Sequence, residues 1–262
     1  MKFTRLCFKA LTSPFRERDL IQCDLVNSSE MLKLQESIND VLHLFFPHTC
    51  AGCGTDVIDH GQMLCLHCLN DLPVTNFFEQ PDNPVEQVFY GRIPVINAGA
   101  AYFFTKDSLL QSLIVQLKYR GNKQIGFYLG QLMGNFLMKS ERYHSVDALV
   151  PLPLNPRREK KRGYNQATAL CNGISSVWNK PVIDKAVVRK VYTETQTHKG
   201  RISRWENMDG IFEVAKPSAL ENRHILLVDD VVTTGATLEA CGSEILKLAG
   251  TALSIATLAY TI

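Results

Sequence analysis

The sequence predicts an α/β protein whose parallel sheet follows a small cysteine-rich module. Short apolar runs alternate with segments in which apolar residues recur at helical spacing, an order typical of a doubly wound parallel sheet. Four cysteines lie close together as two C-x-x-C pairs before the first of these runs. A chain of 262 residues, 45% of them apolar and 21% charged, can bury the core of one main domain and a small appended module.

The residues before the sheet divide into three parts. Residues 1–30 have no clear apolar period and are expected to be a poorly structured extension, with Met1 or Met31 as the true start. Residues 31–72 are expected to hold a helix followed by the cysteine module. Residues 73–94 contain four prolines and few periodic apolar positions, which predicts a linker.

Residues 95–262 are expected to form the main domain. Continuous apolar runs predict buried strands over 98–104, 146–152, 225–228 and 253–259. Apolar residues at helical spacing predict helices over 109–117, 125–139, 167–178 and 238–249. Because strands and helices alternate, the carboxyl ends of the strands should meet at one edge of a parallel sheet, where such folds bind ligands.

The most informative segment, 225–237, reads I-L-L-V-D-D-V-V-T-T-G-A-T. It predicts a buried strand that runs into Asp229 and Asp230, then a loop of small residues and the start of a helix. Backbone N–H groups at a helix start favour a phosphate, whereas two carboxylates repel one and favour hydroxyl groups. A ribose 5-phosphate satisfies both preferences. The alternatives are a different phosphate-binding loop or a strand end with a purely structural role.

This segment resembles, along its whole length, the phosphoribosyl pyrophosphate (PRPP) signature of type I phosphoribosyltransferases. The resemblance implies a type I phosphoribosyltransferase-like parallel sheet. It also implies that Asp229 and Asp230 hold the ribose 2′ and 3′ hydroxyls of PRPP, with Mg²⁺ as the accompanying ion. The 5′-phosphate would be held by Thr233, Thr234, Gly235, Ala236 and Thr237.

A cationic segment follows the strand predicted over 146–152. Three prolines in V-P-L-P-L-N-P predict a turn and exclude a helix, and a basic loop comes next. Beside a ribose phosphate site, its cations would meet the pyrophosphate of PRPP, and a solvated face or a nucleic-acid contact is the alternative. The candidate cations are Arg157, Arg158, Lys161 and Arg162.

Three further features complete the predicted site. Lys118 lies at the end of the helix predicted over 109–117, where it can donate to a phosphate or be solvated. Trp205 and Tyr164 are candidates to stack on a base, with ordinary packing as the alternative. The polar segment 194–208 is long enough to close over a ligand as a flap, or it is a surface loop.

The two C-x-x-C pairs predict a zinc site. Four thiolates at this spacing can close a tetrahedral site without an open position for water, so the zinc would be structural. The ligands would be Cys50, Cys53, Cys65 and Cys68. His48, His60 and His67 lie close enough in sequence to compete as ligands. Two disulfides are the alternative, and the lack of an evident signal peptide disfavours them.

Four motifs together resemble the ComF family of competence proteins. They are the cysteine pairs, L-K-Y-R-G at 117–121, R-G-Y-N-Q at 162–166, and the pattern of Gln196, Arg204, Asn207, Gly210 and Phe212. Asn122 stands where an acidic residue is expected, and Lys199 where a leucine is expected. The resemblance implies a zinc finger joined to a phosphoribosyltransferase domain in the bacterial cytosol, with single-stranded DNA and DNA-uptake machinery such as a helicase as partners.

These observations leave alternative functions. The chain is a phosphoribosyltransferase acting on a nitrogenous acceptor, a PRPP sensor that has lost catalysis, or a protein that handles single-stranded DNA during natural transformation. The phosphoribosyltransferase could also be an enzyme of nucleotide metabolism that is unrelated to DNA uptake. No apolar run approaches the roughly 18 residues needed to span a bilayer, so membrane insertion is not expected and a cytoplasmic location is.

Overall fold

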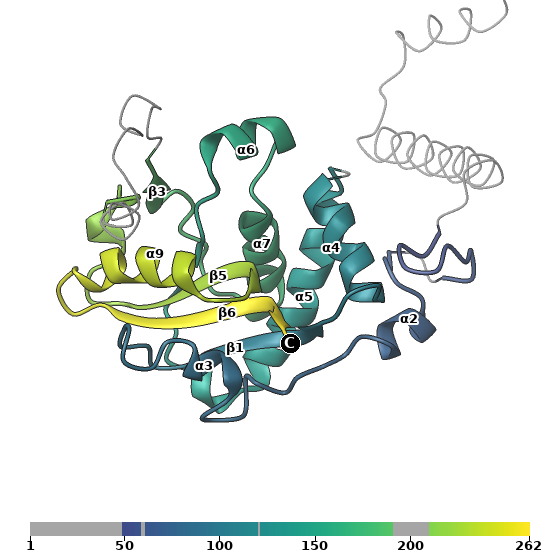
Figure 1. Cartoon of the computed structure of the whole chain (residues 1–262), viewed down its shortest axis with the longest axis horizontal. Helices are drawn as coiled ribbons and strands as arrows, with labels where there is room; N and C mark the ends of the chain where they lie inside the picture. The colour runs from purple at the N-terminus through teal and green to yellow at the C-terminus, as the bar shows by residue number, and fades with distance from the viewer. Residues whose placement is uncertain (1–48, 59–60, 120, 191–209) are drawn as a thin grey trace, which may run out of the picture. The chain divides into compact units, whose positions relative to one another are not determined.

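The structure of the chain is a computed structural model that describes residues 49–58, 61–119, 121–190 and 210–262 (Figure 1). Every element described below belongs to the unit Cys50–Ile262. The N-terminal extension, the helix predicted before the cysteine module and the flap predicted at 194–208 lie outside the described residues.

A four-stranded parallel sheet forms the centre of this unit, in the order β1-β6-β5-β2. Its strands are β1 (Ala98–Phe104), β2 (Ala148–Pro151), β5 (His224–Val232) and β6 (Ala252–Thr261). The predicted parallel α/β fold is therefore confirmed. β5 and β6 are the inner strands, which explains their nearly continuous apolar sequences, because a strand covered on both faces has no solvated side.

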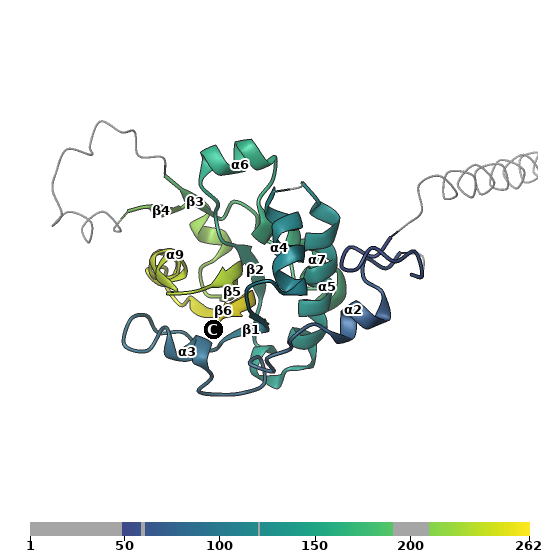
Figure 2. The same ribbon diagram turned by 45° about the vertical axis from the view of Figure 1, so that its right-hand side comes forward.

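Helices cover both faces of the sheet (Figure 2). They are α2 (Leu66–Asn70), α3 (Pro84–Gln87), α4 (Leu109–Tyr119), α5 (Lys123–Lys139), α6 (Pro156–Arg162), α7 (Gln166–Trp178) and α9 (Ala236–Leu246), with 3-10 turns η1 (Glu141–Tyr143) and η3 (Pro217–Ala219). Leu226 and Val228 of β5 pack with α4, α5 and α7, whereas Ile225 and Leu227 pack with α3 and α9. A short antiparallel pair, β3 (Val187–Arg189) and β4 (Phe212–Val214), contacts α9 through β4.

The segment predicted as a linker, 73–94, is instead a packed part of the unit. Three of its phenylalanines are buried, namely Phe77, Phe78 and Phe89. Asn83 caps α3 by accepting hydrogen bonds from two backbone N–H groups, and Pro84 occupies the first helical turn. Because the segment forms almost no regular structure, its buried residues have no period that the sequence can reveal.

The prediction that the basic segment excludes a helix is wrong, because this segment forms α6. Asn155 accepts a hydrogen bond from the N–H of Arg157 at 3.0 Å, and Pro156 stands in the first turn, where a missing N–H costs nothing. Gly163 follows the helix in the left-handed conformation, with a φ of 83°. The prolines therefore precede the helix and do not interrupt it.

Candidate functional site

β5 carries the two acidic residues of the motif in its carboxyl-terminal half. The strand continues through Asp229 and Asp230 to Val232, four residues beyond the predicted range of 225–228. Asp230 is 9% exposed, and its Oδ2 lies 2.9 Å from Nζ of Lys118 in the last turn of α4. The structure thus places Lys118 beside the acidic pair.

Asp229 and Asp230 are incompletely neutralised. Burial raises the pKa of the Asp229 carboxyl, and the negative charge of Asp230 raises it further. The ammonium group of Lys118 opposes this shift, but among the described residues it is the one cation that forms an ion pair with either carboxylate. Hydroxyl groups or a cation would satisfy the pair, and an anion would not.

The loop after β5 and the start of α9 offer hydrogen-bond donors. Thr233, Thr234 and Thr237 are exposed, and Gly235 precedes α9 in the left-handed conformation, with a φ of 70°. Within the described part of the chain, the backbone N–H groups from Gly235 to Leu238 have no hydrogen-bond partner, and no side chain caps them. Such donors attract an anion, and the helix dipole adds to the attraction. One segment of chain therefore carries carboxylates that suit hydroxyl groups and, after four intervening residues, donors that suit a phosphate.

This loop packs on residues that the sequence analysis assigned to the linker. A Cβ atom at Gly235 would lie 2.5 Å from Val88 and 2.9 Å from Phe89, so no larger residue fits there without movement. Arg92 donates a hydrogen bond to the backbone carbonyl of Thr234 at 2.7 Å. No sequence signal identifies these contacts, because 142 positions separate Arg92 from Thr234.

A cationic pocket of about 590 Å³ lies between the end of α4 and α6. It is lined by Lys118, Tyr119, Gly121, Arg158, Lys161 and Arg162. The three cations of α6 share one face because residues three and four positions apart are neighbours on a helix. Arg157, the fourth cation predicted for pyrophosphate, does not line the pocket. Lys118 lines the pocket and also forms the ion pair with Asp230, so the pocket and the acidic pair are neighbours.

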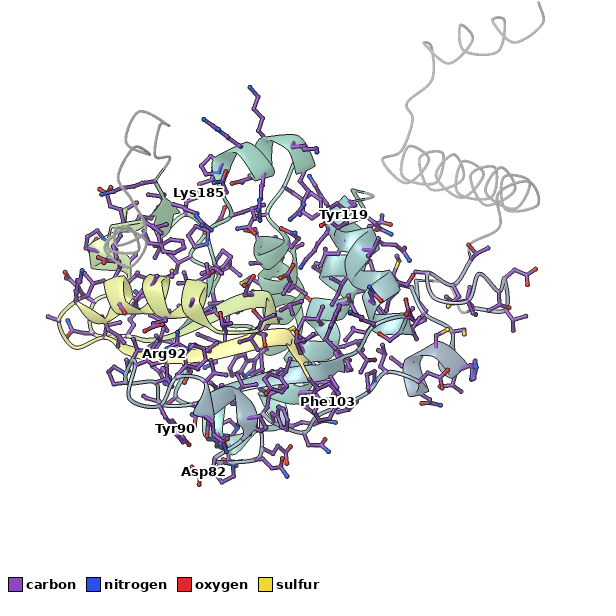
Figure 3. All side chains as sticks on the ribbon, viewed as in Figure 1. Asp82, Tyr90, Arg92, Phe103, Tyr119 and Lys185 are labelled. Atoms are coloured by element: carbon purple, nitrogen blue, oxygen red, sulfur yellow. The ribbon has the colours of Figure 1, made fainter. Side chains whose placement is uncertain are left out.

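Two tyrosines near the pocket differ in their surroundings. Tyr164 is buried, its hydroxyl donates to the backbone carbonyl of Leu117, and Nζ of Lys123 lies 5.3 Å from its ring centroid. It therefore anchors the end of α4, so the packing alternative holds for Tyr164 and its ring is not free to stack on a base. Tyr119 is 76% exposed, and the guanidinium of Arg162 lies 5.8 Å from its ring centroid (Figure 3).

The four predicted cysteine ligands come together in the structure. They are Cys50, Cys53, Cys65 and Cys68, whose sulfur atoms all lie within 4.8 Å of one another. Two of these atoms, in Cys53 and Cys65, are 3.7 Å apart. Thiolates about 2.3 Å from a tetrahedral zinc ion lie roughly 3.8 Å from each other, so this spacing fits zinc better than disulfides. His67 pairs with Asp71 instead of joining the cluster, and His48 and His60 lie outside the described residues.

Backbone N–H groups favour a thiolate at Cys50. Its Sγ accepts hydrogen bonds from the N–H of Cys65 at 3.2 Å and from the N–H of Gly52 at 3.4 Å. Burial raises the pKa of the Cys50 thiol, but backbone N–H groups outweigh burial and lower the pKa to about 6. Burial and the neighbouring thiols raise the pKa of Cys68, an effect that a bound cation would reverse. The donor set therefore fits a closed, structural zinc site.

The cysteine module is joined to the helix that carries Lys118. Nε2 of Gln116 donates to the backbone carbonyl of Ala51 at 2.7 Å. A Cβ atom at Gly52 would lie 2.7 Å from Cδ1 of Leu109, at the start of α4. These contacts hold α4 against the module at its first residue and at Gln116, two positions before Lys118.

The remaining predicted residues have different outcomes. Asn122, a departure from the family pattern, accepts a hydrogen bond from the N–H of Ile125 at 3.1 Å and so caps α5. Four residues of the predicted flap, together with the second departure, lie outside the described residues: Gln196, Arg204, Trp205, Asn207 and Lys199. Among the helices of the described ranges, none has the length and hydropathy of a transmembrane span.

Zinc content tests the cysteine site. We expect the purified protein to contain about one equivalent of zinc, and Cys50→Ser to lose the metal together with several kcal/mol of stability, because structural zinc binding contributes directly to folding. Cys171→Ala, which changes a buried cysteine outside the cluster, should keep the full equivalent. Elemental analysis with thermal unfolding measures both quantities, and a Cys50→Ser protein that retains its zinc would contradict the assignment.

The pH dependence of stability tests the acidic pair. The pKa of Asp229 is raised in the folded protein, so between the usual aspartate value and the raised value the folded state binds more protons than the unfolded state. Stability should therefore fall as the pH rises through this window. The Asp229→Asn variant should lack this decrease in the free energy of unfolding. It should be about 1–2 kcal/mol more stable than the wild type at pH 8, with little difference at pH 4.

Urea unfolding at several pH values measures this difference. Glu221→Gln, a change at an exposed carboxylate, is the control and should leave the pH profile of the wild type in place. An Asp229→Asn protein that is less stable than the wild type at pH 8 would show that the carboxylate contributes net stability, contrary to the analysis above.

Comparison with known proteins places this site in context. No family model matches the chain. The chain is 31% identical over 156 residues to the DNA utilization protein YhgH of Escherichia coli K12, a match that covers 58% of this chain and 68% of that protein. It is 32% identical over 143 residues to competence protein F of Haemophilus influenzae, covering 53% of this chain and 62% of that protein.

Two further similarities are more limited. Competence protein ComFC of Bacillus subtilis is 31% identical over 136 residues, which is 52% of each chain. Among solved structures, the glutamine PRPP amidotransferase of B. subtilis, complexed with ADP and GMP, is similar with a TM-score of 0.40 and 12% identity, over 55% of this chain and 30% of that one. The match thus spans between 52% and 68% of the length of the three sequence relatives. The identity to these competence and DNA utilization proteins, over more than two thirds of YhgH, shows that the chain belongs to the ComF family.

Proposed function

We propose that the chain binds PRPP and acts as a phosphoribosyltransferase in the handling of DNA during uptake. The observation that carries this proposal is the position of two carboxylates, Asp229 and Asp230, separated by four residues from a row of N–H donors that have no partner among the described residues. The carboxylates suit the ribose 2′ and 3′ hydroxyls, and the donors with the adjacent threonine hydroxyls suit the 5′-phosphate. The cationic pocket, which Lys118 connects to Asp230, suits the pyrophosphate.

The reaction that this arrangement supports is transfer of ribose 5-phosphate to a nitrogenous acceptor. The bond between C1 and the pyrophosphate oxygen breaks, and its electron pair leaves with the pyrophosphate. A lone pair on the acceptor nitrogen forms the new bond to C1, and the proton on that nitrogen passes to solvent. The pocket cations stabilise the leaving charge, and Mg²⁺ bound with PRPP would neutralise more of it. Positioning and electrostatics suffice, since one well-placed donor can contribute about 3 kcal/mol.

The outward side of α6 supports a role with single-stranded DNA. Arg157 and Lys160 are exposed, do not line the cationic pocket, and have no ion pair among the described residues. The exposed ring of Tyr119, at the neighbouring pocket, offers a surface on which a base could stack. The names of the relatives, competence protein and DNA utilization protein, support the same role. The protein would act in the cytosol, with DNA-uptake components such as a helicase as partners.

Calorimetry with PRPP and Mg²⁺ tests the ligand site. Asp229→Asn combined with Asp230→Asn should weaken PRPP binding by about 100-fold, because each carboxylate loses a charge-assisted hydrogen bond to the ribose. Glu221→Gln should bind as the wild type does. A double variant that binds PRPP with unchanged affinity would contradict the assignment of the acidic pair.

Pyrophosphate release in the same samples separates catalysis from sensing. Release that depends on the acidic pair and on a nitrogenous acceptor supports an enzyme. PRPP binding without release would overturn the catalytic part of the proposal and leave a PRPP sensor. Turnover without any effect of DNA, in a protein that does not bind DNA, would identify an enzyme of nucleotide metabolism instead.

Two pairs of substitutions on α6 separate DNA binding from PRPP binding. We expect affinity for an oligothymidylate to fall steeply with salt, because each neutralised phosphate of a single strand releases about 0.7 counterions. Replacing Arg157 and Lys160 by alanine should weaken oligothymidylate binding about tenfold and leave PRPP binding unchanged. Replacing Arg158 and Lys161 by alanine should weaken PRPP binding, because these two cations line the pocket, and should also lower oligothymidylate affinity, because they add to the positive charge of the same short helix. Fluorescence anisotropy at several salt concentrations measures the first ligand, and a salt-independent signal would rule out a phosphate contact.

A further inference from the structure

Arg92 holds the backbone of the loop to which the 5′-phosphate is assigned. Its Nη1 donates to the carbonyl of Thr234 at 2.7 Å and to the carbonyl of Val88 at 2.9 Å. Its Nη2 forms an ion pair with Glu239 in the first turn of α9. Both side chains are about one third exposed, at 33% and 29%. One guanidinium thus joins the end of the segment 73–94, the loop and the helix start.

The hydrogen bond to Thr234 determines the direction of a donor. In a trans peptide, the C=O of one residue and the N–H of the next point in opposite directions. When Arg92 holds the carbonyl of Thr234, the N–H of Gly235 must therefore point away from Arg92. Val88 and Phe89 lie against Gly235 on the protein side, so the peptide has little room to turn over. The N–H of Gly235 is one of the donors that have no partner among the described residues.

The ion pair with Glu239 has a second effect. A carboxylate in the first turn of α9 lies near the helix start, where its negative charge would repel a phosphate. The guanidinium of Arg92 neutralises that charge. Three of its five N–H donors are directed at two carbonyls and a carboxylate, which ties the guanidinium to the backbone around the loop. Its effect on the phosphate is therefore assigned to the loop that it holds.

We infer that Arg92 is a positioning residue for the 5′-phosphate subsite. This inference rests on the function proposed above. It keeps the peptide between Thr234 and Gly235 in the orientation that presents an N–H to the phosphate, and it cancels the charge of Glu239. The pyrophosphate subsite, lined by cations of α4 and α6, does not include Arg92. Loss of Arg92 should therefore affect ligands that carry the 5′-phosphate and spare pyrophosphate.

Calorimetry with ribose 5-phosphate and with pyrophosphate as separate probes tests this inference. Arg92→Ala should weaken binding of ribose 5-phosphate about tenfold and leave binding of pyrophosphate within about twofold of the wild type. Arg92→Lys should recover only part of the loss, because an ammonium group cannot reproduce the planar fork. Arg92→Gln retains an N–H donor and replaces the alanine variant if that variant does not fold.

Arg142 provides the matched control. Its guanidinium also donates to a backbone carbonyl, that of Gln80 at 2.8 Å, and pairs with a carboxylate, that of Glu86. Arg142→Ala should lower the melting temperature at least as much as Arg92→Ala, because Glu86 is more buried than Glu239, and should not change the affinity ratio of the two probes.

The possible outcomes separate the inference from the function on which it rests. Equal weakening of both probes by Arg92→Ala, or no weakening of either, would overturn the positioning role while leaving the PRPP site intact. A wild-type protein that binds neither ribose 5-phosphate nor PRPP would overturn the proposed function itself. A selective loss of ribose 5-phosphate binding, absent in Arg142→Ala, supports the inference.

Discussion

Asp229 and Asp230 are consecutive residues near the end of a strand that is covered on both faces. The repulsion between their carboxylates is the constraint on which the rest of the site depends. Burial and mutual repulsion disfavour two charged carboxylates, so the pair costs stability in the absence of a ligand. Lys118 supplies one cation, and it also lines the pocket assigned to pyrophosphate. A bound ligand would compensate the charge that Lys118 does not. Preformed polar sites commonly lower the stability of the protein in this way.

Two segments that precede the sheet in sequence support this site. The cysteine module contacts α4, whose last turn presents Lys118 to Asp230. The segment 73–94 contacts the loop after β5 through Phe89 and Arg92. A zinc ion in the module would therefore stabilise more than the module itself, because the same helix connects the metal site to the acidic pair. In the proposed function, the first segment would support the subsites for the diol and pyrophosphate, and the second would support the subsite for the 5′-phosphate.

In the proposed function, α6 is a short basic helix that serves two kinds of ligand. Its seven residues expose cations on more than one side, with Arg158, Lys161 and Arg162 toward the pocket and Arg157 and Lys160 away from it. A small phosphorylated ligand needs convergent donors, whereas a nucleic acid strand needs charge spread over a surface. The helix satisfies both needs because its faces are separated by the helical repeat. A disordered loop of the same composition would not separate them.

The sequence by itself determined the parallel α/β fold, the order of its main strands and helices, the four cysteines of the metal site and the acidic pair beside a helix start. These features are local: apolar periodicity, C-x-x-C spacing and a contiguous motif each lie within a few turns of chain. Only the tertiary structure decided that 73–94 is packed, that Tyr164 is covered and Arg157 lies outside the pocket, and that Arg92 holds the loop after β5. The helix α6 could have been predicted locally, because the Asn155 cap and Pro156 mark a helix start within the sequence itself. Contacts across 142 positions depend on where distant segments meet, which local patterns do not encode.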